Sequence, residues 1–153
     1  MSDPNHWDNR FINVANMVAT WSKDPGTKVG AVLVSERRII ATGYNGFPQG
    51  IEDHPSRYDD RETKLALTVH AEVNAILNAA KNGAQTENTT LYVTFPPCVS
   101  CTTAVIQAGV TRVVRPDLST SPKRWIESFT RGRRLMVEAG ILVNPYLPSE
   151  PYV

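Results

Sequence analysis

Apolar residues recur at two different spacings along the chain, and the change of spacing separates predicted helices from predicted strands. Within residues 7–22 the apolar side chains return every three or four positions, which predicts a helix with its aromatic residues in the core. Residues 28–34 and 38–43 are instead rich in β-branched side chains and flank the polar stretch 35–37, which predicts a hairpin. The apolar positions of the helix are Phe11, Val14, Ala15, Val18 and Trp21.

The second half of the chain alternates between the two patterns. Glycines follow the helical segments, as is typical where helices end. This alternation predicts an α/β fold in which helices cover both faces of a largely parallel sheet. We expect the tail after Asn144, with three prolines, to lie on the surface. The predicted helices are 70–83, 98–109 and 122–140, and the predicted strands are 89–95, 110–115 and 141–146.

A long polar connection separates the two halves. Residues 45–68 carry glycine, proline and aspartate and show no clear period apart from the short run "TKLAL". A connection of this length in a compact domain is typically functional, for example a lid over a site.

Composition narrows the class of protein. The 153 residues are 41% hydrophobic and 20% charged, with a formal net charge of +1, which predicts a single globular domain over residues 1–153. The start "MSDPNHWDNR" is too polar for a signal peptide, and no apolar run is long enough to span a membrane. We therefore expect a cytoplasmic protein that binds no membrane.

A run of basic residues near the C-terminus raises the question of nucleic-acid binding. Asp117, Glu127 and Glu138 dilute its charge, and no aromatic residues are interleaved as a base-stacking surface requires. We expect a solvated helix face. The basic residues are Arg112, Arg115, Lys123, Arg124, Arg131, Arg133 and Arg134.

Polar residues with metal-binding chemistry lie at the starts of two predicted helices. His70 and Glu72 interrupt an apolar run, where an unpartnered buried polar group costs about 1–3 kcal/mol. Cys98 and Cys101 are the only cysteines, and a spacing of three places both sulfurs on one helical face. Pro97 suits a first helical position. We therefore expect both pairs, His70 with Glu72 and Cys98 with Cys101, to bind a partner such as a metal ion.

A zinc ion is one such partner. One imidazole and two thiolates fill three tetrahedral positions and leave the fourth for water, as in catalytic zinc sites. Glu72 is then placed to take the proton of that water. Other interpretations are a redox CxxC pair, a structural zinc completed by His6 or His54, and a Glu72 that only stabilises a helix N-terminus.

The motifs together point to a family. "HAE" at 70–72 and "PCVSC" at 97–101 match the H-x-E and P-C-x-x-C pattern of zinc-dependent nucleobase deaminases. With "SKDPGTKVGAVLV", "GYNGFPQG", "LYVTFPPCVSC" and "AVIQAGV", the chain resembles deoxycytidylate (dCMP) deaminases from about Trp21 to Gly140. Nucleoside cytidine deaminases usually place Cys where this chain has His70. The tRNA adenosine deaminases lack the "GYNGFPQG" loop, and a third alternative is a nucleotide-sensing protein without activity.

The resemblance implies a fold and a reaction. The fold is a three-layer α-β-α sandwich around a five-stranded mixed sheet. The reaction is the hydrolysis of dCMP to dUMP and ammonia, which supplies dUMP for thymidylate synthesis. His70, Cys98 and Cys101 would hold a single Zn²⁺, since the chain has no spare cysteine, and Glu72 would shuttle protons.

The resemblance also implies substrate and effector contacts. Asn45 matches a substrate-binding position, and Ser22 and Lys23 match a stretch near the substrate phosphate. Trp125 lies near the position where other members have a phosphate-binding Tyr, so it is expected at the substrate site. Because Trp125 has no phenolic hydroxyl, Arg124 or Lys123 is expected to make the phosphate contact. Regulated members are homohexamers activated by dCTP with Mg²⁺ and inhibited by dTTP. Their effector loop corresponds here to Tyr44, Asn45, Gly46, Phe47 and Gly50.

Overall fold

One mixed sheet forms the centre of the molecule. The computed structural model describes residues 5–148, so the first four and last five residues of the predicted domain, Pro151 of the tail among them, lie outside the described range. The strand order is β2-β1-β3-β4-β5. The strands are β1 (Gly30–Ser35), β2 (Arg38–Tyr44), β3 (Thr90–Val93), β4 (Arg112–Pro116) and β5 (Leu142–Tyr146).

The direction of the strands differs between the two halves of the sheet. β1 pairs antiparallel with both β2 and β3, whereas β3, β4 and β5 pair parallel to one another. The predicted hairpin is confirmed, but the expectation of a largely parallel sheet holds only for the β3-β4-β5 half. The strand predicted over 141–146 is confirmed by β5, which ends at Tyr146, so the tail begins after Tyr146 and not after Asn144.

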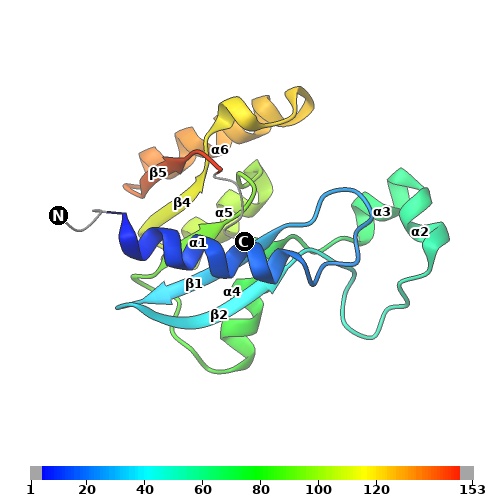
Figure 1. The fold of residues 1–153 in the computed structure, drawn as a ribbon, viewed down its shortest axis with the longest axis horizontal. Coiled ribbons are helices and arrows are strands. Elements are labelled where there is room, and N and C mark those ends of the chain that lie inside the picture. The colour runs from blue at the N-terminus through cyan, green and yellow to red at the C-terminus, as the bar shows by residue number, and fades with distance from the viewer. Residues whose placement is uncertain (1–4, 149–153) are drawn as a thin grey trace.

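Helices cover both faces of the sheet and give three layers. Helix α1 (His6–Ala19) packs on one face, where it appears in front of the strands in Figure 1. The other face carries α4 (Ala71–Lys81), α5 (Val99–Gln107) and α6 (Ile126–Glu138). The α-β-α sandwich around a five-stranded mixed sheet is therefore confirmed. No helix within residues 5–148 combines the length and the apolar character needed to cross a membrane.

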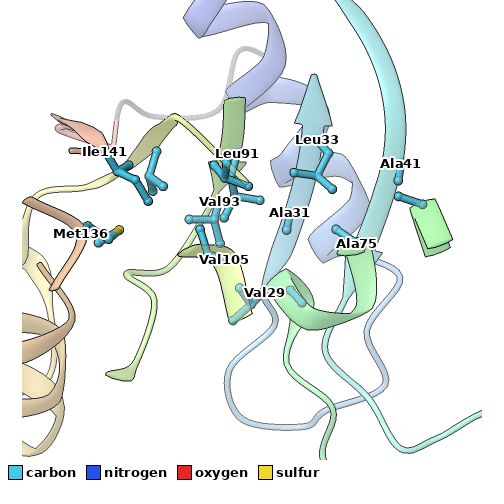
Figure 2. Packing of buried hydrophobic residues seen from close by; sticks show 14 residues of the cluster. Val29, Ala31, Leu33, Ala41, Ala75, Leu91, Val93, Val105, Met136 and Ile141 are labelled. Carbon is cyan, nitrogen blue, oxygen red and sulfur yellow. The ribbon is translucent and has the colours of Figure 1, made fainter. Parts of the chain in front are cut away.

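The side chains of the strands alternate between two cores. In β1, Ala31 and Leu33 belong to the cluster under α4, α5 and α6, which Figure 2 shows together with Val105 and Met136. Their neighbours on the same strand point instead toward Phe11 and Ala15 of α1; they are Val32 and Val34. Because side chains alternate along the strand, the core under α4, α5 and α6 is separate from the core under α1.

Two glycines allow helices to lie directly on the strands. A Cβ at Gly43 would lie 2.3 Å from the Ala75 nitrogen and 2.4 Å from the Ala71 carbonyl oxygen, so β2 and the first turns of α4 are in backbone contact. Likewise, a Cβ at Gly30 would lie 2.0 Å from the Ala15 carbonyl oxygen of α1. Each face of the sheet therefore has one position where only glycine fits.

Some element boundaries differ from the prediction. Helix α1 ends at Ala19, so Trp21 lies beyond the helical period and is 54% exposed, edge-on to Tyr44. Its predicted place in the core is wrong, whereas Phe11 is buried as expected. The last predicted helix is divided: a short 3₁₀ turn, η2 (Lys123–Trp125), precedes α6, and another, η1 (Leu118–Thr120), follows β4.

The long connection contains two short helices that the sequence pattern did not predict. They are α2 (Pro55–Asp59) and α3 (Arg61–Leu67), and Figure 1 shows them at the right, set apart from the sheet. Neither helix has a fully buried residue. The ring of His54 accepts a hydrogen bond from the Ser56 amide and caps α2. With fewer than two full turns each, they are too short to show a helical period.

The basic run does not form one helix face. Arg112 and Arg115 lie on β4, where Arg112 pairs with Asp8 and Arg115 is buried with its guanidinium donating to the Pro116 carbonyl. Arg133 and Arg134 are exposed on α6. The expectation of a single solvated face is therefore wrong for the two strand residues.

Candidate metal and active site

Three metal-binding side chains converge where α4 and α5 begin. His70 is the N-cap of α4, Cys98 is the N-cap of α5, and Cys101 lies in the first turn of α5. His70 Nδ1 lies 3.1 Å from Cys101 Sγ and 3.6 Å from Cys98 Sγ. Pro97 precedes the cap, so its predicted place as first helical residue is off by two positions. Both cap residues, His70 and Cys98, have an extended backbone. This conformation turns the side chains at the start of each helix toward the same point, although they are only two or three positions apart in the sequence.

The donor set fits zinc. Bond lengths of about 2.3 Å to sulfur and 2.0 Å to nitrogen at tetrahedral angles give donor separations of roughly 3.6 Å. The three ligand atoms all lie within 4.8 Å of one another, so small adjustments suffice. This is the one group of this kind found in residues 5–148, and neither His6 nor His54 belongs to it. Within the described chain the geometry therefore offers three ligands and no fourth, as a catalytic site requires.

The electrostatics of the two thiols differ. Hydrogen bonds from the Cys101 thiol and from His70 lower the pKa of Cys98 to about 4, although burial opposes the shift. The hydrogen bond to Cys98, together with burial, raises the pKa of Cys101. Because the imidazole lies within 3.6 Å of both sulfurs, the arrangement favours metal ligation over a simple redox pair.

Glu72 is a buried carboxyl beside this cluster. It lies in the first turn of α4 and is only 4% exposed. Burial raises its pKa to about 7, more than the neighbouring His70 lowers it. A group with a pKa near neutrality can both accept and release a proton at physiological pH. Glu72 thus has the properties of a general acid and base.

The cluster opens into a pocket with an aromatic wall. His70, Glu72 and Cys98 line the pocket together with Phe95, Trp125 and Phe129. The Phe95 and Phe129 rings meet edge to face at 5.3 Å, and Trp125 stacks on Phe129 at 6.1 Å. A flat aromatic ligand could enter between this wall and the cluster.

Three of the predicted substrate residues line this pocket: Asn45, Arg124 and Trp125. The Asn45 amide is already engaged in holding the loop before β1. Its Oδ1 accepts from the Val29 amide at 2.8 Å, and its Nδ2 donates to the Thr27 carbonyl at 2.8 Å. Asn45 therefore shapes the pocket as well as lining it.

Ser22 and Lys23, the residues predicted near the substrate phosphate, do not line this pocket directly. The Ser22 hydroxyl is buried and donates to the Asn45 carbonyl at 2.8 Å. The Lys23 ammonium pairs with Asp53 at 2.8 Å and lines a different cavity. Their polar groups are used within the chain, which sequence matching cannot reveal.

Sequence reasoning also missed charged residues of the pocket. Arg61 and Lys64 of α3 line it, as does Asp24, whose carboxylate bonds Lys64 at 2.9 Å. Asp24 is 5% exposed at its side chain and Lys64 is 25% exposed. Asp24 lies in the motif "SKDPGTKVGAVLV" and Lys64 in the short run "TKLAL", but neither stretch by itself indicates a place in the pocket.

Comparison with known proteins decides the family. Residues 5–115 match the model described as the cytidine and deoxycytidylate deaminase zinc-binding region, which covers most of the chain and all the residues of the cluster. The chain belongs to this deaminase family.

Relatives of the deaminase cover nearly its whole length. An uncharacterized deaminase in the luxG 3′ region of Aliivibrio fischeri is 38% identical over 94% of this chain and 95% of its own. The deoxycytidylate deaminase of Homo sapiens is 34% identical over 94% of this chain and 81% of its own. Among solved structures, the dCMP deaminase of cyanophage S-TIM5 in complex with dCMP and dUMP has a TM-score of 0.76. At 24% identity over 95% of this chain and 100% of that one, it shows that the fold is shared.

A second pocket of the deaminase is formed by the predicted effector loop. Tyr44, Asn45, Gly46, Phe47 and Gly50 all line it, and Asp53, Tyr58 and Asn74 are among the other residues of its wall. Phe47 stacks on Tyr58 at 4.4 Å.

The two pockets meet at a short backbone bridge. Asn45 lines both, and the next residue, Gly46, exchanges two backbone hydrogen bonds with Val69, at 2.8 and 3.1 Å. Val69 directly precedes His70. The wall of the second pocket is therefore hydrogen-bonded to the residue that precedes His70.

Proposed function

We propose that the protein hydrolyses dCMP to dUMP and ammonia, with Zn²⁺ held by His70, Cys98 and Cys101. The observation that carries this proposal is the position of the buried Glu72 beside the converging His70, Cys98 and Cys101 side chains, at an aromatic pocket. The names of the full-length relatives support dCMP as the substrate.

The metal, Glu72 and the aromatic wall have different roles in the proposed reaction. When bound, zinc lowers the pKa of water and so supplies the nucleophile that adds to C4 of the cytosine. Glu72 accepts a proton from the water and delivers it to N3. Glu72 then takes the proton of the hydroxyl group now on C4 and passes it to the exocyclic nitrogen, so that the C4–N bond breaks, the C4 carbonyl forms and ammonia leaves. The aromatic wall holds the base flat in this position and excludes bulk water.

Regulation is assigned to the second pocket. dCTP with Mg²⁺ activates and dTTP inhibits by binding at Tyr44, Asn45, Gly46, Phe47 and Gly50, in a homohexamer. The volume of this cavity, about 430 Å³, is in the range of small-molecule sites and supports a nucleotide ligand. The backbone bridge between Gly46 and Val69 supports a direct effect on His70.

The test is ammonia release from dCMP, deoxycytidine and a cytosine-containing single-stranded oligonucleotide. Each substrate is assayed alone, with dCTP and Mg²⁺, and with dTTP. The proposal predicts turnover of dCMP in preference to the other two, raised by dCTP and reduced by dTTP. Turnover of the oligonucleotide in preference to dCMP would overturn the choice of substrate, and rates insensitive to both nucleotides would overturn the regulation.

A further inference from the structure

The pocket next to the candidate zinc site carries two arginines without an acidic partner. Arg61 from α3 and Arg124 from η2 both line it, and neither forms an ion pair with any carboxylate in the described part of the chain. Lys64, the third cation of the pocket, is neutralised by Asp24 at 2.9 Å. The positive charge of the pocket that has no ion-pair partner therefore lies on the two arginines.

The exposure of the lining residues shows which end of the pocket holds this charge. Glu72 is 4% exposed and lies at the deep end, whereas Arg61 and Arg124 are both exposed to solvent. A cytidine nucleotide has C4 of the base at one end and the 5′-phosphate at the other. A base whose C4 lies beside Glu72 must therefore direct its phosphate toward the mouth of the pocket, where the arginines are.

We infer that Arg61 binds the 5′-phosphate of the substrate, together with Arg124, and that this contact makes the enzyme select nucleotides over nucleosides. The inference rests on the proposed function and adds a residue to it. A guanidinium suits this role because it stays charged and presents paired N–H donors to phosphate oxygens. Trp125, next to Arg124, has no hydroxyl with which to bind the phosphate. Arg61 supplies a charged contact from a helix on another part of the chain.

An arginine on a short exposed helix could instead be solvated and without function. The two cases differ in what its removal does to two substrates that share a base and a sugar. A solvated arginine changes neither rate, and an arginine that only supports α3 changes both equally. A phosphate ligand changes the reaction of dCMP alone.

The experiment compares kcat/KM for dCMP and for deoxycytidine in four proteins loaded with zinc: the wild type, Arg61→Gln, Arg61→Lys and Arg57→Gln. Loss of a hydrogen-bonded charge contact predicts that Arg61→Gln lowers kcat/KM for dCMP by about 10- to 100-fold. The value for deoxycytidine stays within about twofold, and Arg61→Lys recovers part of the loss. Arg57 is the matched control, because it lies on the neighbouring α2, outside this pocket, and bonds the Glu52 carbonyl. Its substitution by Gln leaves the dCMP-to-deoxycytidine ratio at the wild-type value.

Binding of the product gives a second measurement that does not depend on turnover. The affinity for dUMP, measured by calorimetry against deoxyuridine, falls in Arg61→Gln by a similar factor, whereas deoxyuridine binding is unchanged. An Arg61→Gln protein with the wild-type ratio, or with equal losses on both substrates, overturns the assignment of Arg61. A wild-type protein that does not prefer dCMP overturns the proposed function instead, so the two failures can be told apart.

Discussion

Two partly buried polar clusters lie on opposite faces of the sheet, and only in one of them does the chain itself balance the charge. On the α1 face, Arg112 donates to both carboxylate oxygens of Asp8, at 2.9 and 2.5 Å, and Tyr92 donates to the same carboxylate at 2.7 Å. The remaining Arg112 Nε donates to Asn144 Oδ1 at 2.7 Å. Charge and hydrogen-bonding capacity are both satisfied within this network.

The cluster on the other face has the opposite character. His70, Glu72, Cys98 and Cys101 include three groups that become anionic on losing a proton, and none of them pairs with a lysine or arginine of the described residues. A buried set of this kind needs a cation from outside the chain. This difference distinguishes the structural network around Asp8 from the candidate site around Glu72. Substitutions in the two clusters should therefore have different effects on stability and on turnover.

The largest expected effect is on turnover. Glu72→Gln removes the group that carries protons but leaves the three metal ligands, so we expect kcat to fall by about 10³-fold or more. Zinc content, measured by atomic emission on the purified protein, should match the wild type. A variant that keeps near-normal turnover would contradict the role of Glu72.

Removing a metal ligand should affect both function and stability. Cys98→Ala leaves two ligands, so the protein should lose zinc and activity together. Its melting temperature should fall, because the energy of metal binding contributes to folding. Treatment of the wild type with a chelator should reproduce the loss of activity. Full zinc content in Cys98→Ala would show that Cys98 is not a ligand.

The two close-contact glycines form a matched pair across the sheet. Gly43→Ala pushes on α4 and Gly30→Ala pushes on α1, and overpacking of this kind costs about 1–3 kcal/mol of unfolding free energy in each. Only Gly43→Ala should also lower kcat at a temperature where both variants are folded, since α4 carries His70 and Glu72. Equal effects on kcat would mean that the α1 face also determines the site geometry.

The smallest effect is expected for Asp8 on the α1 face. It is an effect on the free energy of unfolding, and it depends on pH. Burial raises the pKa of Asp8, but the hydrogen bonds from Arg112 and Tyr92 outweigh it and leave the pKa below its ordinary value. The ionised carboxylate therefore stabilises the fold above the unfolded-state pKa of about 3.9, and this contribution is lost as the pH falls through the lower folded-state pKa.

Asp8→Asn should lower the unfolding free energy at pH 7 by about 1–3 kcal/mol and leave turnover unchanged. Urea denaturation of both proteins at pH 7, 5 and 3 tests this, with the difference expected to shrink at the lowest pH. A difference that stays constant with pH would show that the charge of Asp8 contributes nothing.

The sequence predicted the parts of this molecule whose signals are local. His70, Glu72, Cys98 and Cys101 could be grouped because each pair starts a helix and lies within a short motif. Phe11 was correctly assigned to the core from its helical period, but Trp21 was not, because the period does not show where α1 ends. Arg61 was missed for another reason: α3 is too short to show a period, and its approach to the pocket depends on tertiary structure.

The separate position of α2 and α3 has a consequence for how such an enzyme can change. Because neither helix contributes a fully buried residue, substitutions along them cost little folding stability. Yet Arg61 and Lys64 on α3 reach the pocket. Selection can therefore alter which molecules are accepted through this segment, while the residues that carry out the chemistry stay under the separate constraint of the sheet and its helices.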